Sequence, residues 1–153
     1  MQTYTSGLSR RGFVKGMMSI IALSAMPFKL LARSATAFKA TTTKDVYKEL
    51  FGDLPMVGSS DIELKIPDIA ENGAVVPVTV STSIPNAEAI YVIIDQNPNP
   101  LSASFHLTPL IPAEISIRVK MGKSSMVQAL VKTADKVYTT GQEVKVTIGG
   151  CGG

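Results

Sequence analysis

Cys151, the single cysteine of the 153-residue chain, is the side chain best suited to covalent chemistry. It is flanked by Gly149 and Gly150 on one side and by Gly152 and Gly153 on the other. Glycine removes side-chain bulk and frees the backbone, so a thiol in this setting could enter a narrow pocket in extended form. Five extended residues reach about 17 Å, at about 3.3–3.6 Å each. The pattern predicts a flexible arm over residues 149–153 that carries a substrate on Cys151 into the buried sites of other proteins.

Other uses of the Cys151 thiol fit its surroundings less well. An intramolecular disulfide is impossible with one cysteine, whereas an intermolecular disulfide stays open as an alternative. A zinc site needs three or four ligands, and the chain offers one cysteine and one histidine. A fixed active site would need a preorganised backbone, which four glycines oppose. We therefore expect a substrate-attachment residue with no metal and no cofactor.

Outside the arm, no group of residues forms a catalytic constellation. His106 belongs to an alternating run and is expected on a strand face without a role. Neither a Gly-x-Ser-x-Gly elbow nor a phosphate loop or dinucleotide fingerprint occurs. The acids near strand ends are not spaced like a general acid and base; they are Asp61, Glu63, Asp68, Glu71 and Glu88. We predict no catalytic residues and a protein that is not an enzyme.

Residues 1–37 have the organisation of an export leader. Arg10 and Arg11 precede an apolar stretch from Met17 to Phe28, and Ala35-Thr36-Ala37 supplies an A-x-A cleavage site. The paired arginines resemble a twin-arginine signal, which directs folded proteins to a dedicated exporter. The apolar stretch of about 12 residues is well short of the roughly 20 that span a bilayer, so a membrane anchor is the less favoured alternative. We expect cleavage after Ala37, export in a folded state, and a periplasmic product that does not bind the membrane.

The leader also accounts for the basic character of the chain. Five of the 15 Lys and Arg residues of the chain lie in residues 1–37, which contain no acid. The remaining chain therefore holds ten bases against twelve acids and has a net charge near −2. A surface that follows the phosphates of nucleic acid would need clustered positive charge. We expect no nucleic-acid partner.

Residues 38–148 are expected to form one domain that begins with a short helix over Thr43–Gly52. Val46, Leu50 and Phe51 fall on one face of this helix, and Gly52 is a natural end. From Asp61 onward, short β-rich runs separated by Pro, Gly and Asn predict a mainly β, antiparallel sandwich rather than βαβ units. The expected strands are Ile62 to Ile66, Val75 to Thr82, Ala89 to Asp95, Ser102 to Leu107, Glu114 to Lys120, Met126 to Thr133, Val137 to Thr139 and Glu143 to Ile148.

Glycines are expected to form the turns between these strands. Gly73, Gly122 and Gly141 each lie between two β-rich runs, where a residue with positive φ favours a tight connection. Alternation in the last run places Val144, Val146 and Ile148 on one face and Lys145 and Thr147 on the other. These turns predict consecutive antiparallel pairing.

Two groups of residues carry a resemblance to a known family. The tail Ile148–Gly153 looks like the carrier tail of the SoxY family, the carrier subunits of thiosulfate oxidation. Ile66–Val78 and Asn97–Leu101, with Phe105, are also similar to that family, as is the twin-arginine leader. The similarity extends over nearly the whole chain.

The resemblance implies an immunoglobulin-like antiparallel β-sandwich that forms a heterodimer with a second β-sandwich subunit of the SoxZ type. It implies that Cys151 is the attachment residue and that Gly149, Gly150, Gly152 and Gly153 form the flexible arm. A haem-containing thiosulfate transferase would load the thiol. A sulfate-releasing hydrolase and, in some organisms, a sulfane dehydrogenase would then act on the bound group. The function expected from this resemblance is a periplasmic carrier of thiosulfate-derived intermediates.

Two rival functions belong to other classes. A ubiquitin-like sulfur carrier also ends in Gly-Gly, but its chemistry needs cytosolic ATP, and its β-grasp fold needs a long helix that this sequence lacks. A structural sandwich that dimerises through Cys151 would not need the flanking glycines. For partner binding, we expect an exposed face rich in Val and Ile.

Overall fold

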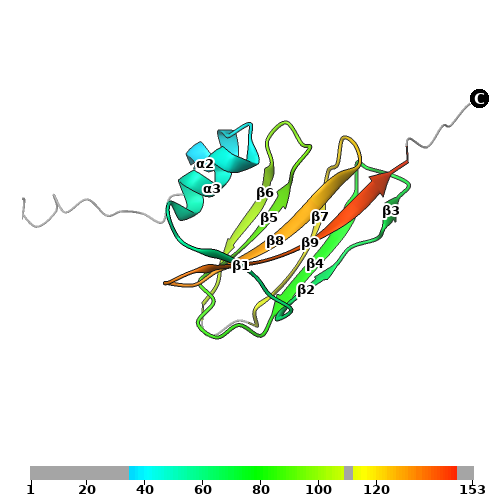
Figure 1. Ribbon diagram of the computed structural model, residues 1–153. Coiled ribbons are helices and arrows are strands. Elements are labelled where there is room, and N and C mark those ends of the chain that lie inside the picture. The colour runs from blue at the N-terminus through cyan, green and yellow to red at the C-terminus, as the bar shows by residue number, and fades with distance from the viewer. Residues whose placement is uncertain (1–34, 109–111, 148–153) are drawn as a thin grey trace, which may run out of the picture. The chain divides into compact units, whose positions relative to one another are not determined.

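A computed structural model describes residues 35–108 and 112–147, which form two short helices followed by a β-sandwich (Figure 1). The helices are α2 (Ala35–Lys39) and α3 (Thr43–Phe51). The strands are β1 (Met56–Gly58), β2 (Ile62–Lys65), β3 (Ile69–Ala70), β4 (Val76–Thr82), β5 (Ala89–Ile94), β6 (Leu101–His106), β7 (Glu114–Val119), β8 (Ser125–Lys132) and β9 (Val137–Val146). The prediction of a mainly β sandwich with a short helix near its start is confirmed.

The strands form two sheets that face each other. The larger sheet has the order β1-β9-β8-β5-β6, with β3 also paired to β9, and the smaller has the order β2-β4-β7. Most neighbours are antiparallel, as expected, but β1 and β3 both pair with β9 in parallel. Residues 56–70 produce this arrangement. β1 pairs with β9, the chain then crosses to the smaller sheet as β2, and it returns to pair with β9 as β3. The expectation of purely antiparallel pairing is therefore wrong at this edge.

The predicted break in the last strand is also wrong. β9 continues from Val137 to Val146 without a turn, and Gly141 pairs with Gln128 inside the ladder. β8 runs beside it from Ser125 to Lys132, so an unbroken neighbour keeps the glycine extended. Cross-strand pairing here overrides the local tendency of glycine to form a turn.

Gly73 and Gly122 lie between strands, as predicted, but without the positive φ that was expected of them. Among the described residues, positive φ occurs at Gly52 and Asn86, not at Gly73, Gly122 or Gly141. A side chain at Gly73 would collide with the backbone oxygen of Met121 and would come within 2.8 Å of Val146 Cγ1. Gly73 is therefore required for a close approach of two chain segments.

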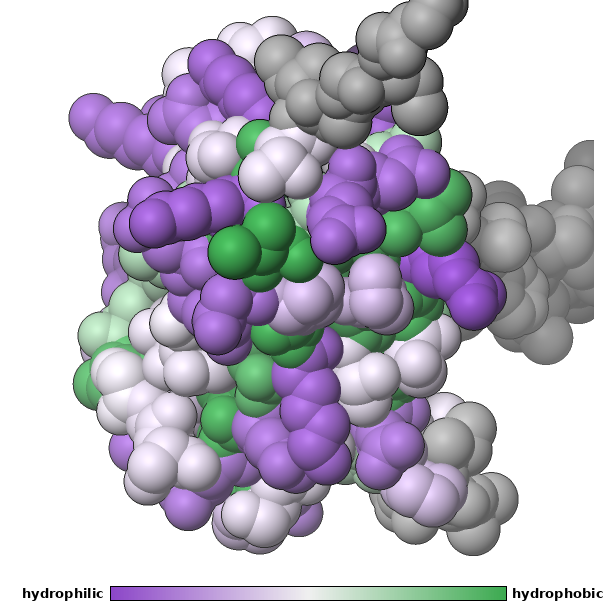
Figure 2. Space-filling view, turned by 90° about the vertical axis from the view of Figure 1, so that its right-hand side faces the viewer, coloured by the Kyte–Doolittle hydropathy of each residue, from purple (hydrophilic) through white to green (hydrophobic). Residues whose placement is uncertain are grey.

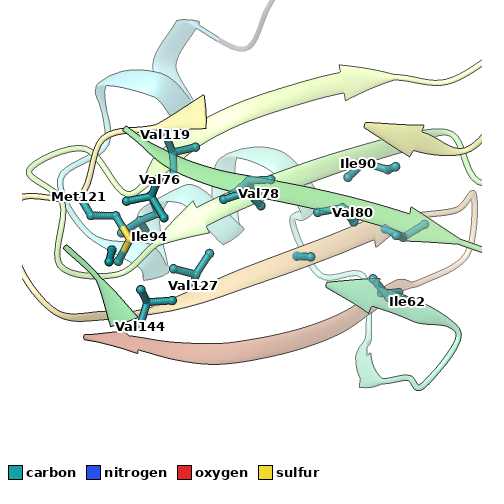
Figure 3. Packing of buried hydrophobic residues seen from close by; sticks show 14 of the residues in the cluster. Ile62, Val76, Val78, Val80, Ile90, Ile94, Val119, Met121, Val127 and Val144 are labelled. Carbon is teal, nitrogen blue, oxygen red and sulfur yellow. The ribbon is translucent and has the colours of Figure 1, made fainter. Parts of the chain in front are cut away.

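The main hydrophobic core lies between the two sheets. On β4, Val76, Val78 and Val80 are fully buried while the residues between them are exposed or half-buried. Ile90 and Ile94 of β5 point into the same space from the larger sheet, as Figure 3 shows. Alternation with period two therefore places one face of each sheet in this core.

A second core covers the outer face of the larger sheet. All six residues of β5 are buried, because α2 and α3 pack on the face that the sandwich leaves uncovered. Phe51 of α3 meets Tyr91 of β5 edge-on, with ring centroids 5.2 Å apart and an interplanar angle of 84°. Ala37 of α2 is also buried in this cluster. Helix α2 was not predicted from the sequence.

The predicted helix α3 is confirmed, together with its ends and its buried face. Thr42 Oγ1 accepts a hydrogen bond from the backbone N–H of Asp45 at 3.1 Å, which caps the helix. Gly52 ends it with φ 58° and donates its N–H to Lys48. Val46 and Phe51 are buried against the sheet.

Polar contacts then fix α3 to the sheet. The Tyr47 hydroxyl donates to Gln128 Oε1 at 2.6 Å, and Gln128 Nε2 donates to Asp95 Oδ1 at 2.8 Å. Burial raises the pKa of Tyr47, and the negative charge of Asp95 raises it further. The hydroxyl is therefore a neutral donor that joins the helix to β8.

Candidate functional site: the root of the C-terminal arm

The residues predicted to carry the chemistry lie outside the described part of the chain. These are Cys151 with its arm glycines Gly149, Gly150, Gly152 and Gly153, and the export-signal residues Arg10 and Arg11. The structure describes the chain up to Thr147, four residues before the cysteine. It therefore shows what fixes the root of the arm, which we define as Lys145, Val146 and Thr147.

Hydrogen bonds hold the arm root on two sides. Lys145 N–H donates to the carbonyl of Asp68 at 2.8 Å, and Thr147 N–H donates to the carbonyl of Ala70 at 3.1 Å. Between them, Val146 N–H donates to Ser124 Oγ at 2.9 Å. These bonds come from the β2–β3 connection, from β3 and from the β7–β8 connection, so three distant segments meet at the end of β9.

Side-chain packing adds to these bonds. Val144 is fully buried and Val146 is partly buried against the main core, whereas Lys145 and Thr147 are exposed. This alternation was predicted for Val144 and Val146, and it is confirmed. The predicted strand end at Ile148 lies outside the described residues.

Gly73 also supports the arm root. Its carbonyl accepts the N–H of Met121 at 2.6 Å, which brings the β3–β4 connection against the start of the β7–β8 connection. The absent side chain leaves the space that Val146 occupies. An arm that continues from Thr147 would thus start from a well-fixed point on the sandwich.

Sequence reasoning missed Ser124, Asp68 and Gly73 as supports of the arm. Ser124 and Asp68 act through a hydroxyl and a backbone carbonyl from distant segments, and no local pattern marks either. Gly73 was predicted as a turn residue and lies in a turn, but its close contact with Met121 and Val146 was not predicted.

The five acidic residues named in the sequence analysis all lie on the surface. Glu63 forms an ion pair with Lys65 at 3.2 Å, and the hydrogen bond from Lys65, followed by its charge, lowers the pKa of Glu63. Glu88 pairs with Lys132 at 3.3 Å. Asp68 Oδ1 accepts from Gln142 Nε2 at 2.6 Å. These contacts are structural, and none brings two of the carboxylates together.

His106 lies exposed at the end of β6, as expected from its alternating run. Over residues 35–108 and 112–147, no three His, Cys, Asp or Glu side chains are grouped so that they could hold a metal ion. None of the helices described there has the length and apolarity needed to cross a membrane.

Comparison with known proteins identifies the family. Residues 47–151 match the family of the sulfur oxidation protein SoxY. The chain belongs to the SoxY family. The matched stretch begins in α3, includes every strand described above, and ends at Cys151.

A solved SoxY structure supports the same fold. The sulfur carrier protein SoxY from Chlorobium limicola f thiosulfatophilum is 44% identical in sequence and superposes with a TM-score of 0.64. The similarity covers 69% of this chain and 96% of that one. A search among proteins of curated function gave no match. The sandwich of this chain is therefore a SoxY fold.

Proposed function

We propose that this chain is a periplasmic carrier that holds thiosulfate-derived intermediates covalently on Cys151 and presents them to partner enzymes of thiosulfate oxidation. The observation that carries the proposal is the position of the single cysteine, between two glycine pairs, at the end of the stretch that matches SoxY. The similar protein from Chlorobium limicola is itself called a sulfur carrier protein. A well-fixed root followed by a glycine-rich arm suits a carrier, because the body stays folded while the thiol reaches into a partner.

The proposed covalent chemistry needs only a thiol from this chain. Joining the outer sulfur of thiosulfate to the Cys151 thiolate forms one sulfur–sulfur bond and releases two electrons, which a haem-containing transferase would accept. Hydrolysis of the terminal sulfonate then releases sulfate and two protons and leaves a persulfide on Cys151. The sequence neighbours of Cys151 are glycines and offer no base, so activation of the thiol falls to the partner. The chain is in this account a substrate of enzymes rather than an enzyme.

Replacing Gly150 and Gly152 with valine tests the role of the arm. Bulky residues beside the thiol would obstruct entry into a narrow pocket, so the loaded fraction of Cys151 in cells grown on thiosulfate should fall about tenfold or more. The measurement is the mass of the intact protein. Gly122→Val is the matched control, because a Cβ there meets no atom within 4 Å. If the double variant loads as well as the control, the glycine arm is not needed and the structural-dimer alternative gains support.

Export by the twin-arginine route is the second part of the proposal. It rests on Arg10 and Arg11 and on the apolar stretch that follows them. Replacing both arginines with lysine should prevent export and leave the chain in the cytoplasm, as measured by cell fractionation. Equal export of the variant would contradict this route.

Cleavage after Ala37 would cut within α2, where Ala37 is fully buried. The peptidase would therefore need α2 to detach from the sheet before the cut. Sequencing the N-terminus of the exported protein would locate the cut.

A heterodimer with a SoxZ-type β-sandwich subunit completes the proposal. The described part exposes five large apolar side chains, which are Met56, Val57, Ile69, Val75 and Met126. Figure 2 shows apolar side chains at one side of the molecule as separate areas between polar ones. Three of the five are valine or isoleucine, and the partner-binding face rich in these residues stays a prediction.

A further inference from the structure

The loop between β5 and β6 has the sequence Asn-Pro-Asn-Pro over residues 97–100 and is closed on itself by backbone bonds. Ile94 N–H donates to the carbonyl of Pro100 at 2.9 Å, and Asn97 N–H donates to the carbonyl of Ile94 at 3.1 Å. Each proline also restricts the backbone of the asparagine before it. The two asparagine side chains therefore project from a well-fixed backbone.

These two side chains support different parts of the molecule. Asn97 Nδ2 donates to the carbonyl of Lys120 at 2.8 Å, and Asn97 Oδ1 accepts the N–H of Gly122 at 3.4 Å. Asn99 Nδ2 donates instead to the carbonyl of Ala40, directly after α2, at 3.3 Å. Asn97 thus holds the β7–β8 connection, and Asn99 holds the helices.

The β7–β8 connection, residues 120–124, supplies a support that the sheet does not give to the arm root. The ladder between β8 and β9 ends at the pair of Ser125 and Val144. Two residues further along β9, the N–H of Val146 donates to Ser124 Oγ at 2.9 Å. Because Ser124 belongs to no strand, its hydroxyl stays in place only if the backbone of the connection is fixed.

The loop that contains Asn97 fixes this connection on both sides of Ser124. Before Ser124, the two bonds of Asn97 flank Met121, which is buried in the main core. After Ser124, the N–H of Gln96 donates at 3.0 Å to the hydroxyl of Ser125, which is also buried. The path of the connection is therefore set by two neighbouring residues of one loop.

We propose that Asn97 is a positioning residue of the carrier, which keeps Ser124 against Val146 and thereby fixes the point at which the arm leaves the sandwich. Asn97 acts through the β7–β8 connection and needs no contact with the group that is carried. This role rests on the proposed function, because the arm matters only if Cys151 carries a group.

The position of the last fixed residue limits how far the thiol can reach. Cys151 is four residues beyond Thr147, a span of at most about 14 Å at about 3.6 Å per residue. If the root were released back to Val144, the span would be seven residues, or about 25 Å. A longer tether samples a larger volume and lowers the effective concentration of the thiol at a partner's pocket.

Amide exchange of the reduced full-length chain tests the role of Asn97. Asn97→Ala should accelerate exchange at Val146 about fivefold relative to Val92 of the core, which reports opening of the whole sandwich. Asn99→Ala is the matched control, because it removes an amide from the same loop on the helix side and should leave Val146 unchanged. In a Ser124→Ala background, Val146 has already lost its acceptor, so Asn97→Ala should add little there.

A nitroxide attached to Cys151, the single thiol, gives a second readout. It broadens the amide signals of residues that the tip of the arm can approach. In Asn97→Ala the broadening should spread to amides that stay sharp in the wild type, because the tether is longer. Asn99→Ala should keep the wild-type pattern. A loss of overall stability alone would not move this pattern while the sandwich stays folded.

Each other outcome overturns the role of Asn97. Equal acceleration at Val146 and Val92 would mean that Asn97 supports only the whole sandwich. The same acceleration at Val146 by Asn99→Ala would remove the difference between the two side chains, and a full effect of Asn97→Ala without Ser124 would exclude the route through that hydroxyl. An unchanged nitroxide pattern would show that the arm starts from the same point. Neither readout uses thiosulfate, so a failure here differs from a failure of the carrier role, which the loading of Cys151 measures.

Discussion

The two sides of the sandwich are built in contrasting ways. On the β9 side, β1 and β3 add to the outer edge of the last strand, and backbone bonds from Asp68 and Ala70 hold its final residues. On the opposite side, β6 and β7 are the last strands of their sheets among the described residues, and a groove separates them. One side is closed where the arm begins, and the other is left open.

The closed side suits the proposed carrier role. A carrier arm must start from a well-fixed point, so that the motion of its tip does not disturb the body. Short parallel strands close the first side, and their absence leaves the second side accessible.

Gly73→Val should lower the stability of the closed side more than any other substitution named below. The new side chain would collide with the Met121 backbone and with Val146, so the free energy of unfolding should fall by about 2–3 kcal/mol. Urea unfolding measures this loss. Amide exchange should also accelerate at Val146 and Thr147 more than at Ser104 of the open side.

Gly122→Val is the control for that experiment. A Cβ at Gly122 meets no atom within 4 Å, so the free energy of unfolding should change by less than about 0.5 kcal/mol. Equal losses in the two variants would mean that the close contact at Gly73 does not fix the arm root.

Tyr47→Phe should lower the free energy of unfolding less, because it removes one hydrogen bond between α3 and the larger sheet and leaves the ring in place. Loss of the bond to Gln128 should lower the free energy of unfolding by about 1 kcal/mol. Urea unfolding at neutral pH measures it. Ser81→Ala, which removes a surface hydrogen bond to Glu63, should cost clearly less. Equal costs would mean that the Tyr47 bond adds little to the attachment of α3.

Much of this fold could be predicted from the sequence, for physical reasons that particular elements illustrate. Helix α3 has a cap, an apolar face and a terminal glycine within the stretch from Thr42 to Gly52, so local signals suffice. β4 alternates cleanly because one of its faces is buried. β1 and β3 are too short to show a period, and their partner β9 is distant in sequence.

The attachment site stays a prediction, and its signals differ from those of the arm root. Cys151 and its glycines stand out by composition, because they are rare neighbours in a chain with one cysteine. The arm root depends on Ser124, Asp68 and Gly73, which meet through tertiary contacts that no local pattern encodes. The groove between β6 and β7 is similarly a product of sheet order.

The most direct test of the carrier role is intact mass spectrometry of the protein purified from cells grown on thiosulfate, with and without reductant. A Cys151→Ser variant from the same cells serves as the control. We predict adducts with the mass of sulfur and oxygen atoms that reductant removes and that the variant lacks. A thiol that stays unmodified, or that is found only in a disulfide-linked protein dimer, would contradict the carrier role.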